Sequence, residues 1–268
     1  MLAPLPLKKL SKKKMLSPWI VPIASTEKRS LRLFCLPYAG GGASVFRKWK
    51  EFLAPNIELF AIQLPGRESR YSETPIQDLS LLIQEIAKSI MNFGYCPFAI
   101  YGHSLGGSLA FELTLELERK GFYPEYLFIS GRQSPGHISL RSPIGHLPDD
   151  QFLNELAQYK STPPEILQNH EFIKLLLPML KADFSIAEKC THEPNKKVLA
   201  DLIAIGSHKD IWLRPTSLEG WGNYTTGKFS TQWFDGGHLF LNENTQSLVD
   251  FIMSKLQPST QSLYDQKP

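Results

Sequence analysis

The sequence predicts an α/β fold: a mostly parallel central sheet flanked by helices, with a helical insertion. From Leu31 onward, short apolar segments alternate with amphipathic ones, an order typical of a parallel sheet built from right-handed crossovers. The apolar segments contain few polar residues, as expected for strands that are buried on both faces. The alternation stops between about residues 136 and 190, where only helical patterns occur, and then resumes.

The elements before this interruption follow from periodicity and from turn residues. We expect Thr74 and Pro75 to open the second helix and Gly121 to end the third, because these residue types favour helix termini. In the first helix, apolar residues recur on one face. The predicted strands cover residues 31–37, 57–65, 98–103 and 126–131, and the predicted helices cover 45–53, 76–93 and 108–121.

The interruption is predicted to form a lid over the carboxyl edge of the sheet, the simplest location for a helical insertion between parallel strands. Its helical segments are 149–159, 164–169 and 171–188. Pro178 lies within the last of these and predicts either a kink or a boundary. After the insertion, we expect strands at 197–207 and 230–237 and a final helix from about 244 to 255.

The predicted parts of the chain are a basic N-terminal extension and lead-in (1–28), one α/β domain (29–258) with the lid at about 136–190, and a C-terminal tail (259–268). Five lysines within the first 14 residues precede an apolar run that resembles a short signal peptide. Pro18 and Pro22 interrupt that run, so we expect a disordered tail, an extended lead-in and a cytoplasmic protein. The sequence leaves open whether translation starts at Met1 or at Met15.

Composition argues against several classes of function. The 268 residues are 42% hydrophobic and 21% charged, with a net charge of +3, which is typical of one soluble globular unit. The body of the chain lacks the basic stripe of a nucleic-acid-binding fold, and no apolar run is long enough to span a membrane. Cys35, Cys96 and Cys190 are widely spaced, so we expect free thiols in a reducing compartment rather than a metal site.

Ser104 is the candidate nucleophile. It lies in the segment Gly102-His103-Ser104-Leu105-Gly106, where the predicted strand 98–103 turns into the next helix. In α/β-hydrolases this turn is the nucleophile elbow, whose strained serine needs small neighbours. Gly102 and Gly106 supply them. The pattern has only three fixed residues, so its position in the predicted fold carries more weight than the match itself.

His238 is the candidate general base. In this fold the base follows the acid in chain order and lies on the loop after the last strand. His238 satisfies both conditions, and Gly236 and Gly237 give its loop the conformational freedom to present it. His103, the nucleophile's neighbour on the strand, is expected to point away from the site.

Asp210 is the candidate orienting acid. It follows the apolar run that ends near residue 206, and its role would be to hold the imidazole tautomer and stabilise the imidazolium. The rivals fit less well: Asp201 lies within the strand, Asp183 lies in the insertion, and Asp235 is too close to His238 in sequence.

Two backbone N–H groups are candidates for an oxyanion hole. One belongs to Leu105, the residue after the nucleophile, and the other to the loop after the first core strand. Here that loop is PYAGGG, residues 37–42, and Ala39 is the predicted donor.

Seven segments together carry a resemblance to a known family: LFCLPYAGGG, QLPGRESR, YGHSLGG, SGRQSP, LLPMLKADF, GSHKD and GGHLFL. From about Pro18 to Leu256 the chain resembles the type II thioesterases, the free-standing editing enzymes of nonribosomal peptide and polyketide synthesis. The resemblance implies an α/β-hydrolase fold with a helical lid. It also implies hydrolysis of acyl or aminoacyl groups from the phosphopantetheine arm of carrier proteins. Under it, Ser104, His238 and Asp210 match the triad, and Ala39 and Leu105 match the oxyanion amides.

The resemblance implies further expectations. The carrier protein domains of a synthase are the expected partners, the chain is expected to be a monomer, and no metal or redox cofactor is needed. Arg67 and Arg132 occupy family motifs, and we expect a structural or entrance-lining role for them. The predicted acyl-binding residues lie in the lid and are Phe152, Phe172, Leu176 and Met179. The same side chains are equally suited to packing on the core.

Two other functions remain alternatives at this point. The chain is also consistent with a general esterase or lipase of the same fold, although the loop Tyr38-Ala39-Gly40-Gly41 differs from the H-G-G-G loop of many lipases. A hydrolase fold used only for binding is the second alternative, and the apparent triad argues against it.

Overall fold

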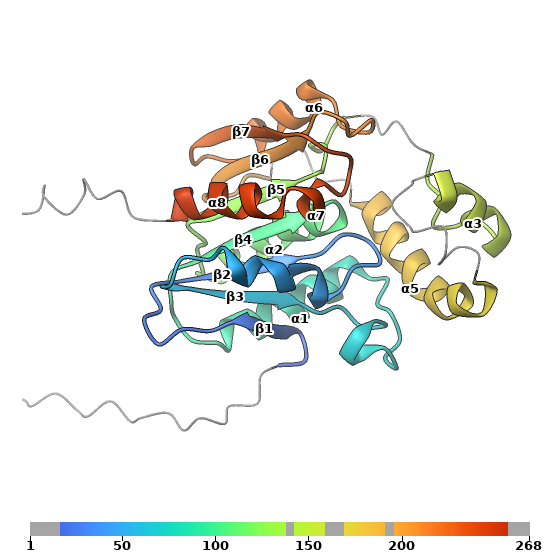
Figure 1. Cartoon of the computed structure of the whole chain (residues 1–268), viewed down its shortest axis with the longest axis horizontal. Coiled ribbons are helices and arrows are strands. Elements are labelled where there is room, and N and C mark those ends of the chain that lie inside the picture. The colour runs from blue at the N-terminus through green and yellow to red at the C-terminus, as the bar shows by residue number, and fades with distance from the viewer. Residues whose placement is uncertain (1–16, 138–141, 159–168, 191–195, 257–268) are drawn as a thin grey trace, which may run out of the picture.

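The computed structural model describes residues 17–137, 142–158, 169–190 and 196–256. In this part of the chain a seven-stranded sheet runs in the order β1-β3-β2-β4-β5-β6-β7. Strand β1 is antiparallel to β3, and every other pair is parallel. The strands are β1 (Ile20–Ala24), β2 (Leu31–Leu36), β3 (Ile57–Ile62), β4 (Phe98–His103), β5 (Tyr126–Ser130), β6 (Asp201–Ser207) and β7 (Phe229–Phe234). The predicted α/β-hydrolase architecture is confirmed (Figure 1).

Helices cover both faces of the sheet. On one face Leu82 and Leu109 belong to a buried apolar cluster, and on the other Phe46 and Ile252 belong to a second one. Strands β2, β3 and β4 are buried along their whole length, which explains their continuous apolar sequences. The helical elements around the sheet are η1 (Ala43–Glu51), η2 (Glu68–Arg70), α1 (Leu79–Met91), α2 (Leu105–Arg119), α6 (Pro215–Glu219), η3 (Gly220–Tyr224), α7 (Phe240–Glu243) and α8 (Thr245–Leu256).

Several predicted boundaries were wrong. Helix α1 begins at Leu79 and not after Pro75, because the Asp78 side chain accepts a hydrogen bond from the Leu81 N–H and caps the helix there. The segment predicted as an α-helix over 45–53 is the 3₁₀ helix η1. The extended lead-in forms the antiparallel edge strand β1, which the sequence analysis did not pair with any neighbour.

The lid consists of α3 (Asp149–Gln158) and α5 (His170–Lys189) in the described residues. Both helices lie beyond one end of the sheet, as Figure 1 shows on its right. Pro178 lies inside α5, which continues through it, so the alternative of a helix boundary there is wrong. The lid has its own apolar cluster, formed by Ile144, Phe152, Leu156, Ile173, Leu177, Met179, Leu180 and Phe184.

Parts of the predicted organisation lie outside the described residues. These are most of the predicted helix 164–169, the lysine-rich segment, and the tail from residue 257 onward. The division at residues 28 and 258 therefore stays a prediction. Within the described ranges, no helix has both the length and the apolar character needed to cross a bilayer.

Candidate active site

Ser104 occupies a strained turn between β4 and α2. Its backbone has φ 56° and ψ −114°, a region that costs a non-glycine residue free energy and that clusters at functional sites. The turn is held by a hydrogen bond from the Ser104 N–H to the Ser130 carbonyl, 2.8 Å long. A Cβ atom on Gly102 would collide with the Gly106 carbonyl, and one on Gly106 would collide with the Leu36 carbonyl. The two glycines therefore permit the close approach of strand, turn and helix.

Ser104, His238 and Asp210 form a continuous hydrogen-bonded chain. The His238 Nε2 atom lies 3.0 Å from the Ser104 Oγ atom, and its Nδ1 atom lies 2.7 Å from the Asp210 Oδ2 atom. An ionised carboxylate only accepts hydrogen bonds, so the proton of a neutral imidazole resides on Nδ1. Nε2 is then free to accept the proton of the Ser104 hydroxyl. The structure thus brings together the three side chains that the sequence analysis selected.

The environment of Asp210 keeps its carboxylate ionised. Burial by itself would raise the pKa of this carboxyl group, since the residue is only 4% exposed. The hydrogen bond and charge of His238 lower the pKa of Asp210 and so oppose the effect of burial. The Trp212 N–H acts in the same direction, because it donates to Asp210 Oδ1 over 3.0 Å. The net effect is a pKa below the ordinary value. Asp210 is therefore a fixed negative charge behind the imidazole at neutral pH.

His103 also contacts the site, although it was expected to point away. Its Nε2 atom lies 2.8 Å from the His238 carbonyl oxygen and its Nδ1 atom 2.9 Å from the Ser130 Oγ atom. Burial, followed by repulsion from His238, lowers the pKa of His103 to about 3. Its ring also packs against the rings of His238 and of Phe240, which opens α7 just after His238. Strand periodicity alone gave no signal of this backbone contact.

The two predicted oxyanion donors lie where the ends of β2 and β4 meet. Leu105 is the first residue of α2. The next residue, Gly106, lies so close to the Leu36 carbonyl at the end of β2 that an added Cβ atom would collide with it. Ala39 lies on the loop that follows β2, half-buried. Among the residues that the structure describes, neither of these two N–H groups has a hydrogen-bond acceptor. The assignment of both as oxyanion donors stays a prediction.

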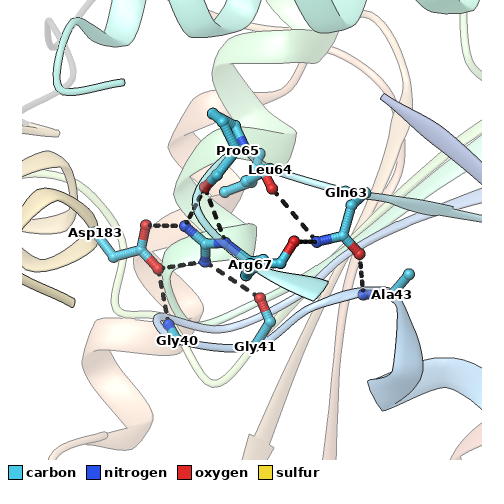
Figure 2. Close-up of polar contacts among 8 residues, drawn as sticks. All are labelled: Gly40, Gly41, Ala43, Gln63, Leu64, Pro65, Arg67 and Asp183. Atoms are coloured by element: carbon cyan, nitrogen blue, oxygen red, sulfur yellow. Dashed lines mark hydrogen bonds and ion pairs between the residues drawn. The ribbon is translucent and has the colours of Figure 1, made fainter. Parts of the chain in front are cut away.

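The loop of residues 37–42, hereafter called the oxyanion loop after its predicted role, is hydrogen-bonded to two other parts of the chain (Figure 2). The Gly40 N–H donates to Asp183 Oδ2 over 2.7 Å, and Arg67 Nη1 donates to the Gly41 carbonyl over 3.2 Å. Asp183 lies in α5 and bonds to Gly40 and Arg67, whereas Asp210 bonds to His238, which agrees with the rejection of Asp183 as the orienting acid. Arg132 also reaches α5, where its Nη2 atom donates to the Ala187 carbonyl over 2.7 Å. Both arginines, for which a structural or entrance-lining role was expected, thus contact the lid helix.

The four predicted acyl-binding residues fall into two groups. Phe152 and Met179 are buried in the lid's own cluster, with 0% and 3% of their surface exposed. Phe172 is 44% exposed, and Leu176 is partly buried against the same cluster. Their role in acyl binding stays a prediction.

The three cysteines are free thiols, with Cys35 and Cys190 buried. In the described ranges, no three side chains of His, Cys, Asp or Glu gather closely enough to hold a metal ion.

Comparison with known proteins gives a consistent result. A family model described as the thioesterase domain matches residues 31–256. Gramicidin S biosynthesis protein GrsT of Aneurinibacillus migulanus is 37% identical over 240 residues, which cover 89% of this chain and 94% of GrsT. Thioesterase PikA5 of Streptomyces venezuelae is 32% identical over 240 residues, or 89% of this chain and 85% of PikA5.

A solved structure with the same architecture is the type II thioesterase BorB from the borrelidin biosynthetic cluster. It superposes with a TM-score of 0.80 at 29% sequence identity, and the match covers 89% of this chain and 98% of BorB.

Proposed function

This chain belongs to the thioesterase family, and from that premise we propose that it is a type II thioesterase with a Ser104-His238-Asp210 triad. Its proposed substrates are acyl or aminoacyl groups held as thioesters on the phosphopantetheine arm of carrier proteins. Its proposed role is to edit misprimed or stalled synthases in natural-product biosynthesis. The observation that carries this proposal is the hydrogen-bonded chain from Ser104 through His238 to Asp210 at a strained strand–helix turn.

The first half of the reaction transfers the acyl group to the enzyme. The Ser104 Oγ atom attacks the thioester carbonyl carbon while His238 Nε2 accepts the hydroxyl proton. The 3.0 Å separation of these two atoms is a normal hydrogen-bond distance and so supports direct proton transfer. Collapse of the tetrahedral intermediate breaks the carbon–sulfur bond. The pantetheine sulfur takes up the proton from His238 and leaves as a thiol.

The second half of the reaction releases the acyl group. A water molecule attacks the ester carbonyl on Ser104 and transfers a proton to His238 Nε2. The second tetrahedral intermediate then expels the Ser104 oxygen, which recovers the proton from His238. The products are a carboxylic acid and the free enzyme. Asp210 stays ionised throughout and stabilises the imidazolium that forms in each half.

The N–H groups of Ala39 and Leu105 are the proposed donors to the oxyanion in both intermediates. Their lack of an acceptor in the described residues supports this role, because a donor already paired would have to break a bond first. Donors of this kind act on charge that develops in the transition state, and removing one typically costs about 10²- to 10³-fold in rate.

The proposal includes the remaining expectations about partners and cofactors. A carrier protein presents the thioester, since the relatives named above belong to biosynthetic systems for gramicidin S and borrelidin. The triad and the two amides complete the hydrolysis without a metal or redox cofactor. A monomer in the cytoplasm is the proposed working state.

Intact mass spectrometry of an acetyl-loaded carrier protein tests the proposal. We expect the native enzyme to restore the mass of the unloaded carrier and Ser104→Ala to leave the acetyl group in place. Full activity of Ser104→Ala would contradict the assignment of the nucleophile. Inactivity of both on the carrier, combined with hydrolysis of a p-nitrophenyl ester by the native enzyme, would indicate a general esterase instead.

A further inference from the structure

A buried ion pair joins the lid to the oxyanion loop. Arg67 follows strand β3, and Asp183 lies on the lid helix α5. The Arg67 Nη1 atom lies 2.6 Å from Asp183 Oδ2, and Nη2 lies 2.8 Å from Asp183 Oδ1, so the contact is bidentate. The two side chains are 5% and 3% exposed. Fully desolvated charges of this kind require good geometry and additional hydrogen bonds to be tolerated.

The additional hydrogen bonds are made with the oxyanion loop itself. Asp183 Oδ2 accepts the Gly40 N–H as well as Arg67, and Arg67 Nη1 donates to the Gly41 carbonyl as well as to Asp183. Figure 2 shows the two contacts next to each other, with Asp183 at the Gly40 N–H and Arg67 at the Gly41 carbonyl. Gly40 is the direct neighbour of Ala39, the proposed oxyanion donor. The position of the Ala39 N–H therefore depends on where this pair holds the following residue.

Arg67 is also hydrogen-bonded to the segment that directly follows strand β3. Its Nε and Nη2 atoms donate to the Pro65 carbonyl over 3.4 and 3.3 Å. The buried amide of Gln63 donates to the Arg67 carbonyl and accepts the N–H of Ala43, the residue that follows the oxyanion loop. Arg67 is thus held by residues that directly follow strand β3, whereas its partner Asp183 belongs to the lid.

Apolar contacts follow the same path from the lid to the loop. A Cβ atom on Gly40 would lie 2.8 Å from Leu180 Cδ2, so α5 packs directly on the loop backbone. Gly40 has φ +79°, a conformation that favours glycine. Ala39 packs against both the core cluster of the sheet and the cluster of the lid. The oxyanion loop therefore packs between the core of the sheet and the lid.

We propose that Asp183 and Arg67 are positioning residues that hold the oxyanion loop in its catalytic geometry only while lid helix α5 is seated. The pair does not touch the reacting atoms. It acts through Gly40 on the Ala39 N–H, and withdrawal of α5 removes the acceptor of the Gly40 N–H and the anion that faces Arg67. Lid seating and completion of the oxyanion hole are then one event. This inference rests on the proposed function.

Kinetics of Asp183→Ala on an acyl-carrier thioester test the inference. Because the oxyanion forms only in the transition state, we expect kcat to fall by about 100-fold while KM stays within about threefold. Hydrogen exchange of residues 38–42 is measured in the same variant and is expected to accelerate. Exchange reports loop tethering directly and does not require an active enzyme.

Asp149→Ala is the matched control. Asp149 is also a lid carboxylate in an ion pair, with its Oδ1 atom 2.7 Å from Lys181 Nζ, but this pair lies at the lid surface. We expect native kcat and native exchange of residues 38–42 in this variant. A loss of kcat equal to that of Asp183→Ala would overturn the specific role of the buried pair.

The double variant Arg67→Met/Asp183→Leu separates positioning from stability, and keeps the test valid if Asp183→Ala folds poorly. Replacing a buried ion pair with apolar side chains is often neutral for stability, so we expect its Tm to recover towards the native value. Its kcat is expected to stay low and its loop exchange fast. Recovery of kcat together with Tm would overturn the inference and leave the pair a purely structural one.

The two proposals fail in different ways. A native enzyme without thioesterase activity defeats the proposed function, whereas accelerated exchange in Asp183→Ala would still support the tether. Native exchange of residues 38–42 in both Asp183→Ala and the double variant overturns the tether whatever the activity.

Discussion

The imidazole of His103 contacts the backbone of His238, the proposed general base: its Nε2 atom lies 2.8 Å from the His238 carbonyl oxygen. A carbonyl only accepts, so Nε2 carries the proton and Nδ1 accepts the hydroxyl of Ser130 over 2.9 Å. This is the neutral ε tautomer, in agreement with a pKa lowered to about 3, first by burial and then by repulsion from His238. His103, which directly precedes Ser104, thus bonds to the loop that carries His238.

His103→Ala is expected to lower kcat by about 10- to 100-fold, because a small displacement of the base weakens proton transfer. His103→Gln retains an N–H group near the position of Nε2 and is expected to restore most of the rate. Steady-state kinetics on an acyl-carrier thioester measure both. His208→Ala serves as the control, since that ring is exposed and stacks on Trp233. Equal rates in His103→Ala and the native enzyme would contradict the role.

His103 also predicts a pH dependence of stability. The pKa of His103 is about 3 in the folded chain and 6.5 at its ordinary value. Between these two pH values the unfolded chain therefore binds a proton at His103 that the folded chain does not bind. The free energy of unfolding therefore falls as the pH falls from about 6.5 towards 3, by roughly 1 kcal/mol per pH unit from this one group. We expect His103→Gln to lose this contribution. Urea unfolding at pH 6.5, 5.5 and 4.5 measures the difference between the two proteins, and parallel pH profiles would contradict the prediction.

The triad was accessible from sequence because its members lie at strand ends. Buried parallel strands have an apolar signature, and their carboxyl ends meet at one edge of the sheet, so Ser104, Asp210 and His238 follow from three strand assignments. The strand boundaries themselves were less accurate. β6 begins at Asp201 and not at Lys197, because Val198 makes only an isolated bridge, to Thr225.

The contacts that position the triad and the oxyanion loop were not accessible in the same way. His103 bonds to a backbone carbonyl, which has no residue-type signature. Arg67 and Asp183 are 116 residues apart, and their contact depends on where the lid helix docks. The strand and helix patterns do not determine that docking. The strand pattern therefore predicted the candidate triad, whereas the contacts around it depend on tertiary packing.

Gly106→Ala is expected to prevent or severely weaken folding. The added Cβ atom would meet the Leu36 and Pro37 carbonyls, and neither backbone group has room to move within a central strand end. A cost of at least about 3 kcal/mol in the free energy of unfolding follows from overpacking at such a site. Gly237→Ala is the control, because nothing lies within 4 Å of its added Cβ atom. Thermal unfolding measures both, and a native Tm for Gly106→Ala would show that β2 and α2 are less closely packed.

The two groups of lid residues predict opposite outcomes of alanine substitution. Phe152 is fully buried in the lid's own cluster, so Phe152→Ala is expected to cost about 3–5 kcal/mol of stability. Phe172 is 44% exposed, and Phe172→Ala is expected to change stability by no more than about 0.5 kcal/mol. If Phe172 and Leu176 contact the acyl chain, their substitution raises KM about tenfold for an octanoyl carrier.

An acetyl carrier is the matched substrate for these lid variants, because its chain is too short to gain from apolar side chains at a distance from Ser104. We expect Phe172→Ala and Leu176→Ala to leave its KM unchanged, so that the ratio of KM values for octanoyl and acetyl carriers reports acyl contact alone. Phe152→Ala, assayed well below its Tm, is expected to keep the native ratio because its ring packs within the lid. A changed ratio in Phe152→Ala with a native ratio in the other two variants would show that the acyl chain enters the lid cluster itself.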